Sequence, residues 1–371
     1  MDRCVLAFTD LYHPTVNGIS HTVSLWKERW SDHHGRMPVI YPAAKGYRPA
    51  RDEYPIRSIP APVYTQYRLG IPVLPSHVPE PDIAHVHTPF TLGISGLEIG
   101  RSRSVPVVGS YHTLLSERAR YLVSSDELGS GLQRLIRQYE RWFYDAVDIV
   151  ITPSSVTQTY LIEAVGLSTP VEVVSNGIDT SFFRPVDATP FLIDHGIDDT
   201  DRIIGYTGRH SPEKDLFDLL EAVDGTNITL LLAGDGPTRT YLERRAGDID
   251  ADIRFLGFLD YEDLPAFFSA LDVFAFPSST ETQGLVALQA IACGTPVVAA
   301  DAGALVETVE HDVTGYRYSP GDIKMFHTYL DRAVTDQSRF REQCLDHRES
   351  MAVERSLEQL AALYDRVERT T

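Results

Sequence analysis

Short apolar runs of strand length alternate with helix-like stretches along the whole chain. Helix-like stretches occur, for example, at 18–30 and 284–292. The alternation is typical of parallel sheets whose two faces are covered by helices, so we expect an α/β protein. The strand-like runs lie at 4–8, 37–41, 82–87, 105–110, 148–152, 171–174, 202–206, 228–233, 253–256, 272–276 and 296–299.

The alternating pattern stops and restarts near Arg184. A turn at 176–179 and a proline-containing segment at 184–190 interrupt it. A chain of 371 residues is also too long for one ordinary α/β domain. We therefore expect two Rossmann-like domains, 1–184 and 185–349, with parallel sheets that face an interdomain cleft. A helical pattern at about 350–371 is expected to pack back on the first domain.

The charge of the chain argues against nucleic acid as a partner. Its formal net charge is -19, whereas binding to phosphate backbones needs a basic surface. Lysine is scarce and occurs only at Lys27, Lys45, Lys214 and Lys324. High acidity with little lysine suits a salt-rich interior, so we expect a halophilic source.

The cysteines and the hydropathy pattern favour a cytoplasmic protein. Cys4, Cys293 and Cys344 are scattered, which predicts neither a disulfide framework nor a zinc site. The apolar run at 5–8 is too short for a signal peptide, and nowhere do 18 apolar residues follow one another.

Two cations lie beside a predicted helix start in the second half. Arg209 follows the strand-like run 202–206, and Lys214 follows Ser211 and Pro212, which suit an N-cap and a first helical position. Cations beside a helix N-terminus can bind a diphosphate. The alternative is a pair of surface cations near a cap.

A second candidate group surrounds the next helix start. Glu281 precedes the helix, Gly284 and Leu285 begin it, and Gln289 lies eight residues after Glu281, within one broad stripe. Glu281 and Gln289 could hold hydroxyls of an elongated ligand whose phosphates meet the first amides. Alternatively, Glu281 merely offsets the helix dipole.

In the first half, candidate residues follow strands. Asn17 and Gly18 form a loop after the first strand; they are not part of a GxGxxG fingerprint. His112 follows the run 105–110, and His85 and His87 end another run, which favours a cleft at strand ends. No histidine and carboxylate set shows metal-ligand spacing.

Together these motifs resemble the retaining GT-B glycosyltransferases of family 4. The resemblance covers nearly the whole chain and is most specific in its second half. The segments that carry it are 14–18, His112, 176–179, 208–209, 213–214, 233–237, 255–258, 275–278, 281–285, 292–298 and 314–315.

The resemblance implies a transferase that moves a hexose from a UDP- or GDP-sugar, with retention of configuration and without a metal ion or cofactor. It implies that Arg209 and Lys214 clamp the diphosphate, that Glu281 holds sugar hydroxyls, and that His112 bonds the transferred sugar, so these four are the implied catalytic residues. The implied donor-binding residues are Asn17, Gly18, Arg209, Lys214, Phe258, Glu281, Gly284, Leu285 and Gln289. Gln289 stands where family members usually have glutamate, which puts donor affinity and nucleotide choice in question.

Two features favour a lipid acceptor. The segments 17–19, 87–93 and 280–284 resemble variants in glycosyltransferases that act on diacylglycerol-type lipids. In addition, three arginines lie on one face of a predicted helix that is otherwise rich in apolar residues, as expected of an interfacial helix at the cytoplasmic membrane face. The alternative is a core-packed helix with a solvated basic edge. The residues concerned are Arg134, Leu135, Ile136, Arg137, Tyr139, Arg141, Trp142 and Phe143.

Two other functions remain open from the sequence. One is a nucleotide-sugar epimerase of the same fold, for which no set of proton-transferring carboxylates can be assigned. The other is a non-catalytic nucleotide-sugar binder, suggested by Gln289. The presence of Arg209, Lys214, Glu281 and His112 argues against the second alternative.

Overall fold

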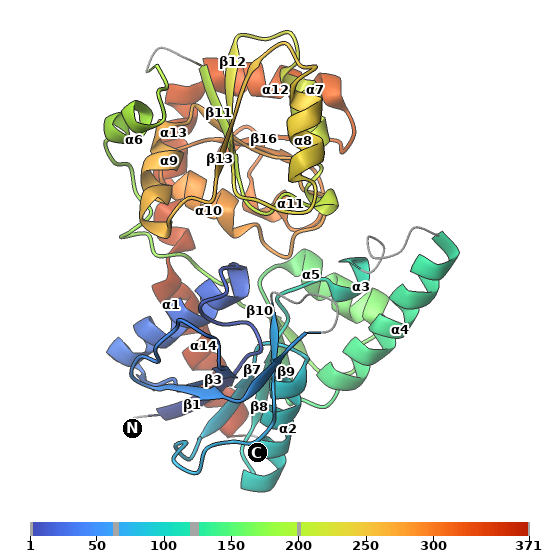
Figure 1. Ribbon diagram of the computed structural model, residues 1–371. Helices are drawn as coiled ribbons and strands as arrows, with labels where there is room; N and C mark the ends of the chain where they lie inside the picture. The colour runs from blue at the N-terminus through green and yellow to red at the C-terminus, as the bar shows by residue number, and fades with distance from the viewer. Residues whose placement is uncertain (1–2, 62–66, 119–125, 199–201, 370–371) are drawn as a thin grey trace. The chain divides into compact units, whose positions relative to one another are not determined.

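The computed structural model describes residues 3–61, 67–118, 126–198 and 202–369 (Figure 1). The chain forms two compact units. Unit 1 runs to Gly177 and resumes at Val353, and unit 2 comprises Ile178–Ala352. The chain leaves unit 1 after Gly177 and returns to it at Val353. These two residues are close together, because a Cβ atom on Gly177 would lie 2.5 Å from the Cα of Val353. Gly177 also has a φ of 66°, which a glycine adopts without strain.

Unit 1 is built on a parallel sheet with the order β10-β9-β8-β7-β1-β3-β4, and β2 pairs with β1. An antiparallel hairpin, β5–β6, lies outside this sheet. The strands are β1 (Arg3–Phe8), β2 (Gly35–Arg36), β3 (Val39–Pro42), β4 (Glu53–Ile56), β5 (Ser58–Pro60), β6 (Arg68–Gly70), β7 (Ile83–Val86), β8 (Val107–Ser110), β9 (Ile149–Thr152) and β10 (Val171–Val173).

Helices bury apolar side chains against this sheet in two clusters. In one cluster, Leu360 and Tyr364 of the last helix pack with Trp26 and Trp30 of the first. The other cluster contains Phe8, Leu92 and Phe143. The helices are α1 (Gly18–His33), α2 (Thr91–Arg103), α3 (Leu115–Arg118), α4 (Asp126–Tyr144), α5 (Ser155–Thr159), the π-helical turn Tyr160–Val165 and α14 (Val353–Glu368).

Unit 2 contains a parallel sheet with the order β13-β12-β11-β14-β15-β16. Its strands are β11 (Arg202–Thr207), β12 (Ile228–Ala233), β13 (Asp252–Gly257), β14 (Val273–Phe276), β15 (Val297–Ala300) and β16 (Gly315–Tyr318). Its helices and 3₁₀ turns are α6 (Thr189–Asp194), Pro212–Lys214, α7 (Leu216–Val223), α8 (Arg239–Ala246), Tyr261–Asp263, α9 (Leu264–Ala270), α10 (Leu285–Ala292), α11 (Leu305–Thr308), α12 (Ile323–Thr335), α13 (Gln337–Asp346) and Arg348–Met351. β12 and β14 are fully buried, as expected of central strands covered on both faces.

The predicted α/β class with two parallel sheets is confirmed, and the predicted strands lie within two residues of the observed ones. The sequence pattern did not predict β2, β4, β5, β6 or β16. These strands are two to four residues long and lie at the ends of the sheets, off the main strand order or in the hairpin, where an apolar run is not required. None of the helices in the described parts of the chain is long and apolar enough to cross a membrane.

Candidate functional site

In unit 2 the strand order reverses between β11 and β14, which are adjacent and parallel. In open α/β sheets, ligands bind outside the carboxyl ends of strands at such a reversal. The loop after β11 carries Arg209 and Lys214, and the loop after β14 carries Ser278 and Glu281. The strand order therefore gathers these residues, which are some 70 positions apart in the sequence, at one edge of the sheet.

Lys214 and Glu281 form an ion pair at this edge. Their side chains are only 13% and 14% exposed, respectively, so water screens the pair less than it would a surface pair. The Nζ of Lys214 also donates to the Oγ of Ser278 at 3.4 Å, and Ser278 donates to the carbonyl oxygen of Glu213 at 3.3 Å. The cation and the carboxylate are thus held between two loops.

The segment between β11 and α7 differs from the single helix start that the sequence suggested. Ser211 is at the N-cap position of the turn Pro212–Lys214, but its side chain makes no capping bond. Asp215 then adopts a left-handed conformation with a φ of 48°, and α7 begins only at Leu216. The Oγ of Ser279 donates to Asp215 at 2.9 Å, which ties the two loops together again.

Two buried polar atoms beside Arg209 have no hydrogen-bond partner within the described residues: Nδ1 of His210 and Oγ of Ser211. The Nε2 of His210 bonds the carbonyl oxygen of Ala233 at 3.2 Å, which assigns the ring proton to Nε2. Arg209 itself is partly exposed, and its carbonyl oxygen accepts from the hydroxyl of Tyr206 at 3.2 Å.

The start of α10 lies beside the ion pair in sequence and presents free amides. Gly284, with a φ of 84°, is the N-cap, and a Cβ there would lie 2.7 Å from Leu305. The first amide of the helix, that of Leu285, has no partner in its own helix, as at any helix N-terminus. Gln289 is a buried residue of α10. Because Glu281 precedes the helix, the proposed stripe shared by Glu281 and Gln289 is wrong: helical spacing does not connect them.

Other loops follow the same edge. Phe258, at the end of β13, is 72% exposed. The loop after β12 approaches its neighbours closely, since Gly234 donates to the carbonyl of Gly257 at 2.6 Å and a Cβ on Gly236 would lie 2.2 Å from the carbonyl oxygen of His210. Glycine is therefore required at position 236 for this packing.

In unit 1, three histidines stack at the carboxyl ends of β7 and β8. The ring centroids of His85 and His87 are 4.1 Å apart, and those of His87 and His112 are 5.5 Å apart. The Nδ1 of His87 bonds the Nε2 of His112 at 3.2 Å. His85 bonds the hydroxyls of Tyr364 at 2.6 Å and Ser110 at 2.7 Å.

The three rings are neutral at neutral pH. Burial lowers the pKa of His85 to about 3 and that of His112 to about 4, and it also lowers the pKa of His87 well below its usual value. A hydrogen bond between the His112 ring and the side chain of Asn176 opposes part of the effect at His112. This edge of unit 1 therefore offers uncharged hydrogen-bonding groups.

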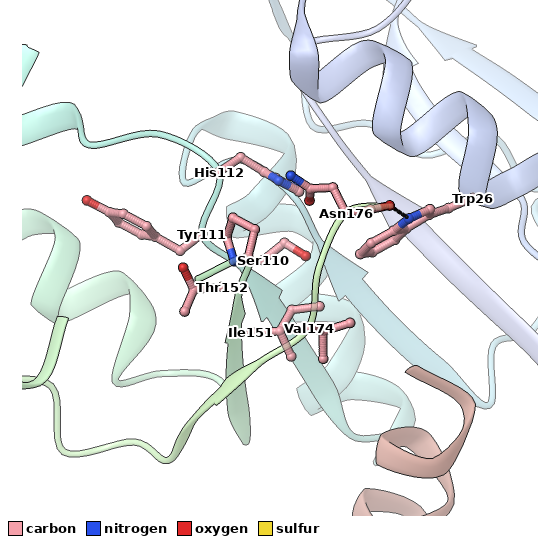
Figure 2. Close-up of a pocket in the computed structure, with 9 residues that line it drawn as sticks. Trp26, Ser110, Tyr111, His112, Ile151, Thr152, Val174 and Asn176 are labelled. Atoms are coloured by element: carbon pink, nitrogen blue, oxygen red, sulfur yellow. Dashed lines mark hydrogen bonds between the residues drawn. The ribbon is translucent and has the colours of Figure 1, made fainter. Parts of the chain in front are cut away.

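His112 borders a narrow hollow within unit 1, which Trp26 and Asn176 also line (Figure 2). Figure 2 shows the side chains of His112 and Asn176 pointing toward each other, while the indole of Trp26 donates to the carbonyl oxygen of Asn176 at 2.8 Å. The hollow has no enclosed space for a water-sized molecule, whereas ligand pockets usually measure about 300–1,000 Å³, so it does not by itself enclose a ligand.

Asn17 and Gly18 begin α1. The Asn17 side chain accepts from the amide of Ser20 at 2.9 Å, and the amide of Asn17 donates to the Ser20 hydroxyl at 3.0 Å, which is a capping box. The carbonyl-type oxygen of Asn17 is therefore used by the helix. The sequence pattern did not single out Trp26, because its bond to Asn176 joins residues far apart in the sequence, which no local pattern signals.

Two family models match the chain: "Glycosyltransferase Family 4" over residues 16–182 and "Glycosyl transferases group 1" over residues 189–351. The sulfoquinovosyl transferase SQD2 of Arabidopsis thaliana is 30% identical, over 76% of this chain and 56% of its own length. The alpha-monoglucosyldiacylglycerol synthase of Streptococcus pneumoniae is 26% identical, over 79% of this chain and 70% of its own length. The chain thus spans only part of these relatives.

Solved structures show the same fold. The sucrose-phosphate synthase of Thermosynechococcus elongatus aligns with a TM-score of 0.80, at 20% identity, over 100% of both chains. HepE of Anabaena, solved in complex with UDP-glucose, aligns with a TM-score of 0.73, at 19% identity, over 98% of this chain and 99% of its own. By both sequence and fold, the chain belongs to the glycosyltransferases that join a family 4 domain to a group 1 domain in the GT-B fold.

Proposed function

We propose that this protein transfers a hexose from a UDP- or GDP-sugar to a membrane lipid or a lipid-linked saccharide, with retention of the anomeric configuration. The observation that carries the proposal is the Lys214–Glu281 pair at the strand reversal of unit 2. A cation and a carboxylate held side by side match the diphosphate and the sugar hydroxyls of such a donor.

In the proposed site, Lys214 and Arg209 stabilise the negative charge that develops on the departing diphosphate. The amides of Gly284 and Leu285, at the start of α10, donate to phosphate oxygens. Protein cations and helix amides supply the charge compensation, so the proposed mechanism needs no metal ion. The amide of Gln289 can both donate hydrogen bonds to ribose hydroxyls and accept them, whereas the carboxylate of a glutamate can only accept them.

Donor binding changes the Lys214–Glu281 pair in this proposal. As Lys214 turns to the diphosphate, the carboxylate of Glu281 becomes available to accept hydrogen bonds from sugar hydroxyls. Ser278, which already contacts Lys214 at 3.4 Å, is placed to keep the ammonium group hydrogen-bonded during this exchange. In unit 1, we propose that His112 bonds the transferred sugar. The backbone amide of Gly18 and the side-chain NH2 of Asn17, which the capping box leaves unbonded, would contribute donor-binding groups at the start of α1.

The exposed face of α4 supports a lipid acceptor. Leu128, Leu135 and Trp142 recur every seven residues and are 67%, 63% and 57% exposed. Arg134 and Arg141 are exposed beside this stripe. Leucine and tryptophan next to arginine suit the interface of an anionic membrane.

The other face of α4 packs in the core, as the alternative interpretation of this helix expected. Phe143 and Tyr144 are buried, and Arg137 pairs with Glu117 at 2.9 Å. Core packing therefore accounts for one side of the helix but leaves the stripe defined above uncovered within its own unit. The names of the two relatives above, a sulfoquinovosyl transferase and a diacylglycerol-glycoside synthase, also favour a lipid acceptor. The free, buried Cys4, Cys293 and Cys344 suit a reducing compartment, so we propose action at the cytoplasmic face of a membrane.

The test is incubation of the purified protein with labelled UDP- and GDP-hexoses and vesicles of total lipid. Transfer predicts label in the lipid fraction, with an α-linked product from an α-linked donor by proton NMR. A changed sugar without transfer would identify an epimerase, and donor binding without turnover would identify a non-catalytic binder; either outcome would contradict the proposal.

A further inference from the structure

His87 is a buried residue after β7 that contacts His112. It lies between His85 and His112 in the stack and is 1% exposed. Its Nδ1 bonds the Nε2 of His112 at 3.2 Å. Its Nε2 is buried and has no hydrogen-bond partner within the described parts of the chain. We propose that His87 is a positioning residue that holds His112 with its ring proton on Nδ1.

The first step concerns the proton between the two rings. Both rings are neutral, as described above, so each carries one N–H and one bare nitrogen. The bond between Nδ1 of His87 and Nε2 of His112 therefore contains a single proton, donated by one ring to the other. Two assignments are possible, and they place opposite groups on the free side of His112.

The second step uses the unpartnered nitrogen. If the proton of His87 were on Nε2, a buried N–H would have no acceptor, and such groups are rare in proteins. If the proton is on Nδ1, the buried Nε2 only carries an unused lone pair. The second assignment makes His87 the donor and the Nε2 of His112 the acceptor, so the proton of His112 resides on Nδ1.

The neighbours of the pair are compatible with this assignment and do not determine it. His85 contacts two hydroxyls, those of Tyr364 and Ser110, which can each donate or accept. The amide of Asn176, which bonds His112, likewise carries both a donor and an acceptor. Of these groups, only His87 has one ring nitrogen that bonds His112 and one that has no partner in the described chain. His87 therefore sets the tautomer of His112.

The consequence deepens the proposed function, on which it rests. With Nε2 occupied by His87, His112 presents an N–H and no free lone pair. His112 then donates a hydrogen bond from Nδ1 to an oxygen of the transferred sugar and does not act as a proton acceptor. In this assignment, proton removal from the acceptor hydroxyl falls to another group, such as a phosphate oxygen of the donor.

The decisive experiment is the tautomer of His112 in the unliganded full-length protein, measured by long-range ¹H–¹⁵N spectra after labelling of histidine. The signal is assigned by its absence in His112→Gln. We expect a protonated Nδ1 and a bare Nε2. A protonated Nε2 on His112 would overturn the proposal, whatever the activity of the protein.

Two substitutions at His87 test its role. Asparagine places an amide near the position of Nδ1, so His87→Asn should keep the donor, whereas His87→Leu removes it. We expect His87→Leu to give a mixture of tautomers at His112 and about a tenfold lower kcat with little change in donor KM, and His87→Asn to restore both. An unchanged tautomer in folded His87→Leu contradicts the inference.

His85→Asn is the matched control, because His85 is equally buried and stacked but does not bond His112. It should leave the tautomer of His112 as in the wild type, and a shift as large as in His87→Leu would assign the effect to general packing. Failure of the proposed function is distinguishable, since it would appear as no turnover of any nucleotide sugar while the tautomer remains as expected.

Discussion

Both units carry their candidate residues at the carboxyl-end edge of a parallel sheet, but these residues are charged in unit 2 and uncharged in unit 1. Each places candidate residues at the carboxyl ends of parallel strands beside a reversal of strand order, between β11 and β14 in unit 2 and between β1 and β7 in unit 1. In unit 2 the edge holds a charged pair, Lys214 and Glu281, together with Arg209. In unit 1 it holds the stacked neutral rings of His85, His87 and His112.

The difference follows from solvation. Lys214 and Glu281 each retain some exposure and carry opposite charges that compensate each other. Among the residues that the structure describes, no carboxylate pairs with the buried His85 and His87, so burial favours their neutral forms. The edge of unit 2 is therefore suited to an anionic ligand group, and that of unit 1 to uncharged hydroxyls.

The largest expected effect tests the charged edge. Lys214→Ala and Glu281→Ala should each lower kcat/KM for transfer by about 10²–10³, because a group that stabilises developing charge or orients the sugar is lost. Initial rates with labelled donor measure this. Arg245→Ala serves as control, since Arg245 forms an exposed pair with Glu221 in the same unit and should keep near-normal rates. Near-normal turnover of folded Lys214→Ala or Glu281→Ala would place the site elsewhere.

A smaller effect tests the neutral edge through pH. The pKa of His85 is lowered from 6.5 to about 3 and that of His112 to about 4 by burial. Between pH 6.5 and these values the unfolded chain binds protons that the folded chain does not, so the free energy of unfolding decreases as the pH falls. At pH 5 each of these two rings should lower the free energy of unfolding by about 2 kcal/mol relative to its value at pH 7.

Tryptophan fluorescence can assign this loss to unit 1, because all three tryptophans, Trp26, Trp30 and Trp142, belong to it. Urea unfolding followed at pH 7 and pH 5 should show the decrease, and His85→Asn should reduce it. The exposed His77 provides the control, since His77→Gln should leave the pH dependence unchanged. Equal unfolding free energies at the two pH values would show that these rings are not held neutral.

The exposed stripe of Leu128, Leu135 and Trp142 on α4 is a further feature that distinguishes unit 1, and its proposed membrane contact can be tested. Leu135→Glu should weaken binding to anionic vesicles about tenfold, because it removes apolar burial and adds repulsion. Sedimentation with vesicles measures the partitioning, and the fluorescence of Trp142 should shift to the blue on binding. Ile193→Glu is the matched control: Ile193 is 70% exposed, on α6 of unit 2. Equal binding of the wild type and Leu135→Glu would remove α4 from the membrane contact.

The smallest expected effect is common to both units. With a net charge of -19, we propose a halophilic source, and an increase from about 0.1 to about 2 M KCl should raise the Tm by a few degrees as screening reduces self-repulsion. Calorimetry measures the change. A Tm that falls with KCl over this range would contradict the halophilic interpretation.

The α/β class, the two parallel sheets and most strand positions were predictable from the sequence, because strand and helix periods are local properties of the chain. The same local reasoning put Arg209, Lys214, Glu281 and His112 after strands. It also grouped Glu281 and Gln289 in one helical stripe, although Glu281 precedes the helix that begins at Leu285, so helical spacing does not connect the two side chains. It also suggested one helix start at Pro212, where the left-handed Asp215 divides the segment in two.

Strand order and side-chain partners were decided by the tertiary structure alone. The pairing of Lys214 with Glu281 requires β11 to lie beside β14, although β12 and β13 separate them in the sequence. The bond between His87 and His112 likewise requires β7 beside β8. Periodicity indicates which residues form a strand, but the order of strands results from the packing of all the helices and strands at once, so no local pattern contains it.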